Sequence, residues 1–390
     1  MDRCGSYLRE EDEVKALVIH PRFTVYGGGE FLCLQTCSVL QKMGYDVDLV
    51  SDERDIETVR RIYGNEMSNV MKKVSWRPIP AFKPVLKKLM AFQRLWYARR
   101  LANSFDGDGY DIAFSTQSSI YHADGIPSYH FLYDIADLFQ YPRLSTSGFK
   151  PSNPKRWYYF ALRWEQAILT RGLHPDHFFA LGGMVLDDLR SLGYQNSSLI
   201  FPPCRMDFKP KNKIKRVVQA TRLVPQKRLE FFFDIARRLP QYDFLIVGRD
   251  NPILQKFNPG YANALMSKAP ENVIYTESPI KERPDLLEES KVYLYTGIEP
   301  GIGIAMCEAM GAGCIPVAPS VGGGSEVIKY GNAGYTFPRN NVEMAANTVE
   351  DALESNPSGY DDPLTISRLA NETFGPEAFE LKIRGLINGQ

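Results

Sequence analysis

Residues 296–328, TGIEPGIGIAMCEAMGAGCIPVAPSVGGGSEVI, place a glycine loop, a short helical stretch, an apolar strand and a second glycine loop in direct succession. Gly301 and Gly303 allow the backbone to approach a ligand closely. A helix that begins near Ile304 directs its unpaired amides toward an anion such as phosphate. Glu308, one turn further, can accept hydrogen bonds from the vicinal hydroxyls of a ribose. The stretch thus predicts an anion and sugar site, although a Glu that only complements the helix dipole fits it equally.

Strand and helix patterns alternate in the residues that precede this stretch. A helix pattern, KRLEFFFDIARRLP, lies among the strand patterns RVVQATRLV, YDFLIVGRD, NVIYTES and KVYLYTG. The alternation indicates an open α/β sheet. Arg222 and Lys227 follow the first strand, where they could neutralise a diphosphate or serve as ordinary solvated cations.

The first half of the chain shows the same alternation. The apolar run VKALVIH at 14–20 predicts a buried strand, and a turn at Gly27, Gly28 and Gly29 leads into a helix that begins at about Glu30. Three consecutive glycines indicate an unusual backbone, a close ligand or a tight turn. They lack the GxGxxG spacing of a nicotinamide-binding or flavin-binding turn.

Two further features of this half bear on a site. Asp46 and Asp48 flank the start of the strand DVDLVS, and their spacing fits surface alternation better than a metal-binding pair. His130 lies at the predicted carboxyl end of a strand, where ligands collect in open parallel sheets. A lone His is more often a packed residue than a catalytic one, so both roles stay open for His130.

Length predicts two domains, because 390 residues exceed the size at which a single core usually stops growing. The fold class is α/β, with two doubly wound domains facing each other across a cleft. LIFPPCRMDFKPKNKIK, rich in Pro and Lys, predicts the crossing between them. We place an N-terminal domain at 1–205 and a C-terminal domain at 206–372, with a helix at 373–390 that joins the first domain.

Composition excludes several classes of protein. The formal net charge is zero, so the chain as a whole is no generic binder of polyanions. The polar, acidic N-terminus is not a secretory signal, and no apolar run approaches the roughly 18 to 20 residues of a helical membrane span. The six cysteines are scattered without a CxxC pair, which is typical of reduced thiols. We expect a cytoplasmic protein.

Residues 67–105 differ from the rest of the chain because they contain no Asp or Glu. A helical pattern with an apolar face follows Pro84, and aromatic residues are interleaved with many cations within 72–100. Such a helix suits an anionic membrane surface on the cytoplasmic side. A core-packing helix with a solvated basic face and contact with single-stranded nucleic acid are the competing interpretations, and nucleic acid is the least favoured.

Four segments together resemble a known family, the retaining GT-B-fold glycosyltransferases of family 4. The resemblance covers almost the whole chain and rests on GGGE at Gly27–Glu30, TRLVPQK at Thr221–Lys227, EPGIGIAMCEAMGAGCIPV at 299–317 and GGGSE at Gly322–Glu326. Within that family, GGGE and IFPPC at Ile200–Cys204 are most similar to the lipid-linked-oligosaccharide α-1,2-mannosyltransferases.

The resemblance assigns roles to particular residues. It implies that Arg222 and Lys227 hold the donor diphosphate, with the helix start at Gly303 and Ile304, and that Glu308 binds the nucleotide ribose. Gly28 and Gly29 would lie against the donor phosphate and acceptor, and His130 would orient and polarise the donor sugar.

The chain departs from the family at two positions. Eight residues separate Glu299 from Glu308 where the family has seven, so either the loop bulges and Glu299 still reaches the donor sugar, or Pro300 takes the acidic position. Thr221 stands where the family usually has Gly.

The implied reaction moves a hexose, mannose for example, from a nucleoside-diphosphate sugar to a lipid-linked or saccharide acceptor with retention of configuration. Charge builds on the departing diphosphate, where fixed cations and amides stabilise it. We expect neither a metal nor another cofactor, and the sequence offers no credible cluster of metal ligands. A sugar-nucleotide epimerase of similar fold and a catalytically idle sugar-nucleotide-binding scaffold are the alternatives.

Overall fold

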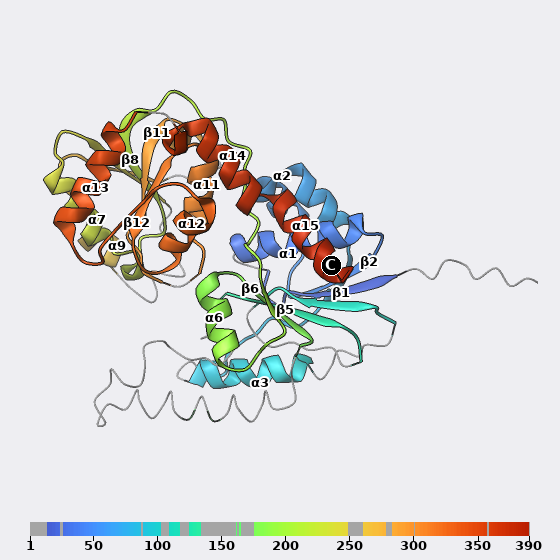
Figure 1. Ribbon diagram of the computed structural model, residues 1–390. Helices are drawn as coiled ribbons and strands as arrows, with labels where there is room; N and C mark the ends of the chain where they lie inside the picture. Colours follow the sequence, from blue (N-terminus) through green and yellow to red (C-terminus); the bar gives the residue numbers. More distant parts are fainter. Residues whose placement is uncertain are drawn as a thin grey trace, which may run out of the picture. The chain divides into compact units, whose positions relative to one another are not determined.

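The computed structural model describes residues 14–23, 26–86, 89–102, 109–117, 125–133, 161, 164, 175–248, 260–277, 283–299, 301–356 and 359–389. The chain divides into two compact units, Met1–Phe179 and Ala180–Gln390. Figure 1 gives the labels of the helices and strands.

Strands between residues 15 and 199, which belong to the first unit and the start of the second, form a parallel sheet. Its seven strands follow the order β3-β2-β1-β4-β5-β6-β7, with bounds β1 (Lys15–Ile19), β2 (Asp46–Ser51), β3 (Ser75–Pro78), β4 (Ile112–Ser115), β5 (Ser128–Leu132), β6 (His177–Ala180) and β7 (Ser197–Leu199). The helices of this half are α1 (Gly28–Lys42), α2 (Ile56–Lys73), α3 (Met90–Ala102) and α6 (Gly183–Ser191). The order places β1 inside the sheet, between β2 and β4, and the loop after β1 opens at the carboxyl edge, where such sheets bind ligands.

The second unit contains a six-stranded sheet of order β10-β9-β8-β11-β12-β13. Its strands are β8 (Ile214–Ala220), β9 (Asp243–Gly248), β10 (Val273–Glu277), β11 (Ser290–Leu294), β12 (Ile315–Pro319) and β13 (Tyr335–Phe337). Its helices are η3 (Pro225–Lys227), α7 (Leu229–Arg238), α9 (Tyr261–Met266), α10 (Asp285–Glu288), α11 (Ile304–Gly311), α12 (Gly323–Gly331), α13 (Val342–Glu354), η4 (Gly359–Asp361), α14 (Pro363–Phe374) and α15 (Pro376–Ile387).

Helices cover both faces of this second sheet. Helix α7 contacts α13, α11 contacts α14, and the two groups lie on opposite sides of β8, β11 and β12 in Figure 1. A sheet covered on both faces requires strands that are apolar throughout. Strand β9 shows this, since Phe244–Val247 are all buried.

The predicted α/β class and its two parallel sheets are confirmed. The strand predicted at 14–20 is β1, and the helix predicted from about Glu30 begins two residues earlier, at Gly28. Helix α3 begins at Met90, later than its apolar pattern indicated. The sequence also predicts a helix at 154–170, and this segment lies almost entirely outside the described residues. The described units meet at Phe179 and Ala180, and the boundary proposed at 205 and the attachment of 373–390 to the first domain stay predictions.

One surface prediction was wrong. Asp46 is exposed, but Asp48 is buried. Its carboxylate forms an ion pair with Arg77 of β3 and accepts a hydrogen bond from the Tyr110 hydroxyl. Alternation failed here because β2 is buried on both faces, as shown by the burial of every residue from Val47 to Ser51.

Candidate active site

The loop before α11 and the start of α12 pack against each other by backbone. Gly301 adopts φ +89°, a left-handed conformation that favours glycine. The Gly323 amide donates to the Glu299 carbonyl over 2.8 Å, and a Cβ on Gly323 would lie 1.6 Å from the Gly301 carbonyl oxygen. The second glycine loop therefore shapes the first, which leads into the uncapped N-terminus of α11 at Gly303.

We expect Gly323→Ala to lower the melting temperature by about 4–8 °C or more, because the added methyl must displace the loop backbone. Gly303→Ala is the matched control, since a Cβ there meets only ordinary contacts at 3.7 Å. Thermal unfolding measures both variants. Equal melting temperatures for Gly323→Ala and the wild type would contradict the close packing of the two loops.

Glu308 lies on α11, partly exposed, beside the segment that follows β7. Burial raises the pKa of its carboxyl to about 7. The charge of Arg205 and a hydrogen bond from its backbone amide lower this pKa, whereas the charge of Asp207 raises it further. Arg205 itself forms an ion pair with Asp207 at 2.9 Å between Nη2 and Oδ1. The carboxylate thus becomes fully ionised only above neutral pH.

Lys227, Tyr295 and Glu299 form a cluster in the same unit. Lys227 ends η3, and the Thr296 hydroxyl donates to its carbonyl over 2.6 Å. Its Nζ lies 3.2 Å from Glu299 Oε1 and 3.3 Å from the Tyr295 hydroxyl, which also donates to Glu299 Oε2 over 3.0 Å. The longer spacing between Glu299 and Glu308 therefore leaves Glu299 in contact with the predicted diphosphate cation.

Arg222 is exposed on the loop after β8. Burial raises the pKa of Tyr295, and the positive charge of Arg222 offsets only part of that increase. The loop accepts Thr221 without a left-handed backbone. The close approach here is made by Gly248, whose Cβ would lie 2.0 Å from the Thr221 carbonyl oxygen. The departure from glycine at Thr221 is thus compatible with the local backbone.

A carboxylate occupies the N-terminus of α6. Glu326 of α12 accepts hydrogen bonds from the backbone amides of Gly183, over 3.2 Å, and Met184. Burial raises the pKa of Glu326, and these two amides oppose that effect. Side chains at the N-cap Gly182 and at the first helical residue, Gly183, would collide with α12, because a Cβ on Gly182 would lie 2.7 Å from Glu326 Oε2 and one on Gly183 2.4 Å from the Tyr330 hydroxyl.

In the first unit, the predicted glycine turn begins α1. The Glu30 carboxylate accepts the Gly27 amide over 2.7 Å, and the Tyr63 hydroxyl donates to the Gly27 carbonyl over 2.7 Å. Gly28 is the first helical residue. A Cβ on Gly29 would lie 3.2 Å from the Tyr133 hydroxyl. This turn is therefore held by its own polar contacts as well as by glycine.

Two histidines of this unit, His130 and His20, differ from the sequence interpretation. His130 occupies the third position of the five-residue strand β5 rather than its carboxyl end, and it is fully buried with its ring edge toward Phe178. His20 directly follows β1, with Nδ1 2.9 Å from the Thr116 hydroxyl and Cε1 3.9 Å from a Cβ on Gly29. The carboxyl end of β1 was the signal that could have singled out His20.

Burial alone would lower the pKa of His20, but neighbouring Cys33, Glu30 and Asp52 raise it overall. His20 is thus an electrostatically tuned side chain beside the glycine turn. It is one candidate site residue that the sequence interpretation missed.

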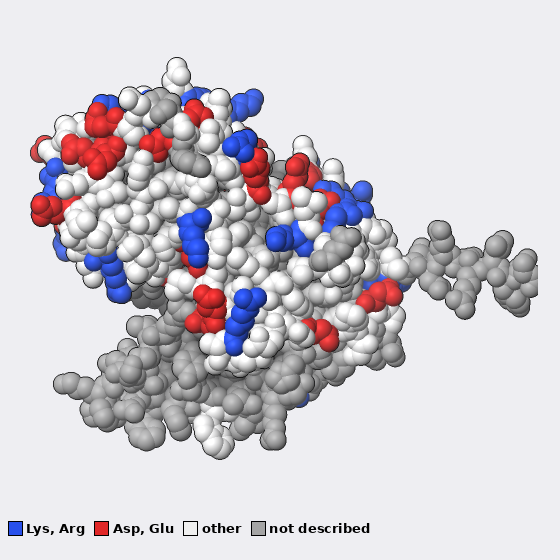
Figure 2. All heavy atoms as spheres, in the orientation of Figure 1, with Lys and Arg blue, Asp and Glu red and all other residues white. Residues whose placement is uncertain are grey.

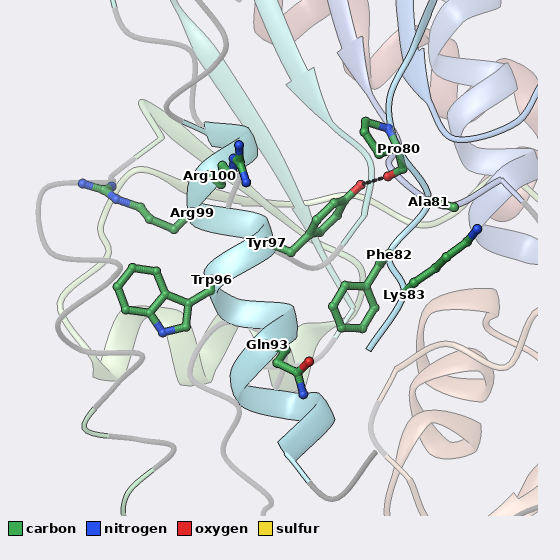
Figure 3. A pocket seen from close by; sticks show the side chains of 9 residues that line it. All are labelled: Pro80, Ala81, Phe82, Lys83, Gln93, Trp96, Tyr97, Arg99 and Arg100. Atoms are coloured by element: carbon green, nitrogen blue, oxygen red, sulfur yellow. Dashed lines mark hydrogen bonds between the residues drawn. The ribbon is translucent and has the colours of Figure 1, made fainter. Parts of the chain in front are cut away.

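The basic segment forms a hollow of about 660 Å³ along α3 (Figure 3). The Tyr97 hydroxyl donates to the Pro80 carbonyl over 2.7 Å and its ring packs on Phe82, while Lys83 and Arg100 are exposed at the hollow. Trp96 is 61% exposed. Within the described part of the chain, no helix is long and apolar enough to cross a membrane.

Charged residues of both signs are interspersed on the face of the second unit drawn in Figure 2. That distribution agrees with the formal net charge of zero. The segment at 67–105 differs from this distribution, because its sequence contains no Asp or Glu.

Comparisons with known proteins bear on the fold and the enzyme class. Residues 214–355, most of the second unit, match the family model described as Glycosyl transferases group 1. No curated protein matches the chain.

Solved structures match nearly the whole chain. HepE of Anabaena in complex with UDP and glucose shares 14% identity at TM-score 0.65, covering 97% of this chain and 100% of its own. The sucrose-phosphate synthase of Thermosynechococcus elongatus shares 14% identity at a TM-score of 0.65, and the match covers 96% of this chain and 98% of the synthase. WaaG, a glycosyltransferase involved in lipopolysaccharide biosynthesis, shares 15% identity at a TM-score of 0.63, and the match covers 96% of this chain and 100% of WaaG. The chain therefore has the GT-B fold, its residues 214–355 are similar to group 1 glycosyltransferases, and the prediction of a glycosyltransferase enzyme is confirmed.

Proposed function

We propose that the protein is a retaining hexosyltransferase that moves a sugar, with mannose as the first candidate, from a nucleoside-diphosphate donor to a lipid-linked or saccharide acceptor. The observation that carries the proposal is the arrangement around one loop of the second unit. This loop begins with Glu299, in contact with Lys227, and ends at the uncapped start of α11, the helix that carries Glu308. A diphosphate and a ribose are the groups that such donors and acceptors of hydrogen bonds recognise together.

In this proposal, the cationic residues and backbone amides bind the diphosphate, and a carboxylate binds the ribose. Lys227, Arg222 and the amides at Gly303 and Ile304 would stabilise the diphosphate as it leaves, and fixed donors of this kind usually contribute most to catalysis. Glu308 would bind the ribose. These cations make a metal unnecessary for charge neutralisation, so activity is expected to survive addition of EDTA.

The first unit would supply the acceptor side. We assign Gly28 and Gly29 to the donor phosphate and acceptor, and His130 to orientation of the donor sugar. Full burial of His130 in β5 means that it could reach a sugar only if its neighbours move, whereas His20 lies beside the glycine turn. Comparing His20→Ala with His130→Ala in a transfer assay distinguishes the two.

Sugar transfer to a lipid extract tests the proposal most directly. The donors would be radiolabelled GDP-mannose, UDP-glucose and UDP-N-acetylglucosamine, because HepE was solved with UDP and glucose whereas the IFPPC segment favours mannose. Transfer from one donor, lost in Lys227→Met, is the expected result. Nucleotide binding without transfer from any donor would support the idle scaffold instead. A free epimer formed from donor alone would identify an epimerase.

We further propose that the basic segment holds the enzyme at the anionic, cytoplasmic face of a membrane. The protein should sediment with vesicles of phosphatidylcholine containing phosphatidylglycerol, and less so at high salt, since screening weakens surface attraction. Arg94→Glu with Arg100→Glu, both exposed on α3, should reduce binding. Arg237→Glu with Arg368→Glu, two exposed cations of the second unit, is the control. Equal binding to neutral vesicles would contradict the proposal.

A further inference from the structure

Tyr295 directly follows β11 and is 6% exposed. Three glycines from different segments surround its ring. A Cβ on Gly297 would lie 2.8 Å from the hydroxyl, one on Gly324 would lie 2.7 Å from Cδ1, and one on Gly303 would lie 3.7 Å from Cε2. The first two distances are shorter than a side chain permits, so Gly297 and Gly324 make room for this tyrosine.

The Tyr295 hydroxyl connects a cation to an anion. Lys227 Nζ lies 3.3 Å from the hydroxyl oxygen and 5.3 Å from the ring centroid, while the hydroxyl donates to Glu299 Oε2 over 3.0 Å. Lys227 and Glu299 also pair directly at 3.2 Å, with side chains 20% and 31% exposed. One ammonium therefore has three contacts within a single partly buried cluster, an ion pair, a hydroxyl and a ring face.

The carboxylate of Glu299 already neutralises Lys227 in the protein without ligand. A diphosphate that arrives at Lys227 brings negative charge within a few ångströms of Glu299, and like charges at that distance disfavour each other. The phosphate must then displace the carboxylate from the ammonium. The Tyr295 hydroxyl is the contact of Glu299 that can persist during this exchange, because it does not involve the lysine.

We propose that Tyr295 is a positioning residue that holds Glu299 as the resting partner of Lys227, and that the donor diphosphate replaces this carboxylate. The displaced Glu299, still tethered to Tyr295, then lies beside the bound donor instead of turning into solvent. The proposal rests on the proposed function for the nature of the ligand. It also explains how Glu299 can remain near the donor despite the longer spacing between Glu299 and Glu308, because Tyr295 holds its carboxylate.

Calorimetric titration with UDP and GDP tests the exchange without requiring sugar transfer. Glu299→Gln should bind the nucleotide that the wild type binds about two- to fivefold more tightly, because the internal competitor has lost its charge. Tyr295→Phe should tighten binding in the same direction, because Glu299 is held less firmly on Lys227. In both variants kcat should fall at least about tenfold, since the carboxylate no longer lies beside the donor. Tighter binding with slower turnover is not expected from a merely structural role.

The double variant Tyr295→Phe with Glu299→Gln should bind like Glu299→Gln alone, because the two side chains act through one contact. Tyr293→Phe is the matched control, two residues earlier and within β11, where the Tyr293 hydroxyl donates to the Ala220 carbonyl over 2.9 Å. Glu354→Gln is the matched control for an ion pair, since Glu354 contacts Lys215 at 2.6 Å on the surface. Both controls should leave nucleotide affinity unchanged.

The outcomes separate the inference from the function on which it rests. Unchanged or weaker binding in Glu299→Gln and Tyr295→Phe, with wild-type melting temperatures, would overturn the inference alone. Additive effects in the double variant would also overturn it. Failure of the wild type to bind either UDP or GDP would overturn the proposed function and the inference together.

Discussion

Lys227→Met is expected to lower kcat/KM for sugar transfer by about 100-fold to 1000-fold, the effect of removing one fixed donor at a developing negative charge. The ammonium lies at the end of η3, where the Thr296 hydroxyl and the Glu299 carboxylate fix its backbone and side chain. Negative charge on the departing diphosphate increases in the transition state, so most of the loss should appear in kcat. Steady-state kinetics with the preferred donor separates kcat from KM.

Lys215→Met is the control for this variant, because Lys215 also pairs with a carboxylate, Glu354, but on an exposed surface. It should keep wild-type kinetics. Arg222→Met should show a smaller loss than Lys227→Met, because Arg222 is exposed to solvent, which weakens its interactions. Wild-type turnover in Lys227→Met would mean that the diphosphate binds elsewhere.

Glu308→Gln is expected to reduce nucleotide affinity at pH 8 by about tenfold to 100-fold, because charge-assisted hydrogen bonds to the ribose become neutral ones. The wild type should also show a characteristic pH dependence. Burial raises the pKa of Glu308 to about 7, so its carboxylate is protonated progressively as the pH falls through 7. Affinity should therefore rise as the pH increases through 7 and level off once the carboxyl is fully ionised, above neutral pH.

The variant supplies its own control, since Glu308→Gln has no carboxyl to titrate and should lose the part of the pH dependence near 7. Measuring uridine, which has the ribose without phosphates, removes phosphate titration from the comparison. A raised pKa also means that protonation of Glu308 stabilises the folded protein, a contribution present below pH 4.5 and lost as the pH rises through about 7. Uridine affinity that is independent of pH from 6 to 8 would argue against a ribose on Glu308.

Periodicity sufficed to predict most of the described strands and helices, because strands buried on both faces are apolar runs and cannot be mistaken for loops. It also predicted that the loop at 299–303 leads into an exposed helix start. The cluster of Lys227, Tyr295 and Glu299 could not be predicted from periodicity. Tyr295 reads as one more apolar strand residue, and its role depends on Gly297 and Gly324, which are close only in the folded chain.

Glu299 and the histidines show the same limit. Whether Glu299 could compensate for one extra residue depended on the left-handed backbone of Gly301, which spacing alone does not specify. A site role was considered for His130 because it lies at the predicted carboxyl end of a strand. The aromatic residues around it do not fix where that strand ends, and β5 continues past it. His20 lies at a true strand end. Strand ends, which determine the site in this fold, are the least certain feature of a sequence pattern.

Glu326 at the start of α6 has a consequence for how the chain distributes its anion-binding capacity. A helix N-terminus attracts phosphate, yet here a carboxylate of the chain itself acts as an internal ligand for the α6 amides. At the start of α1, Glu30 does the same for the Gly27 amide. Helix α11 has no such side-chain cap among the described residues. At α6 and α1, two helix starts led by glycine, amides that could bind free phosphate or sulfate are thus already bound to carboxylates of the chain itself.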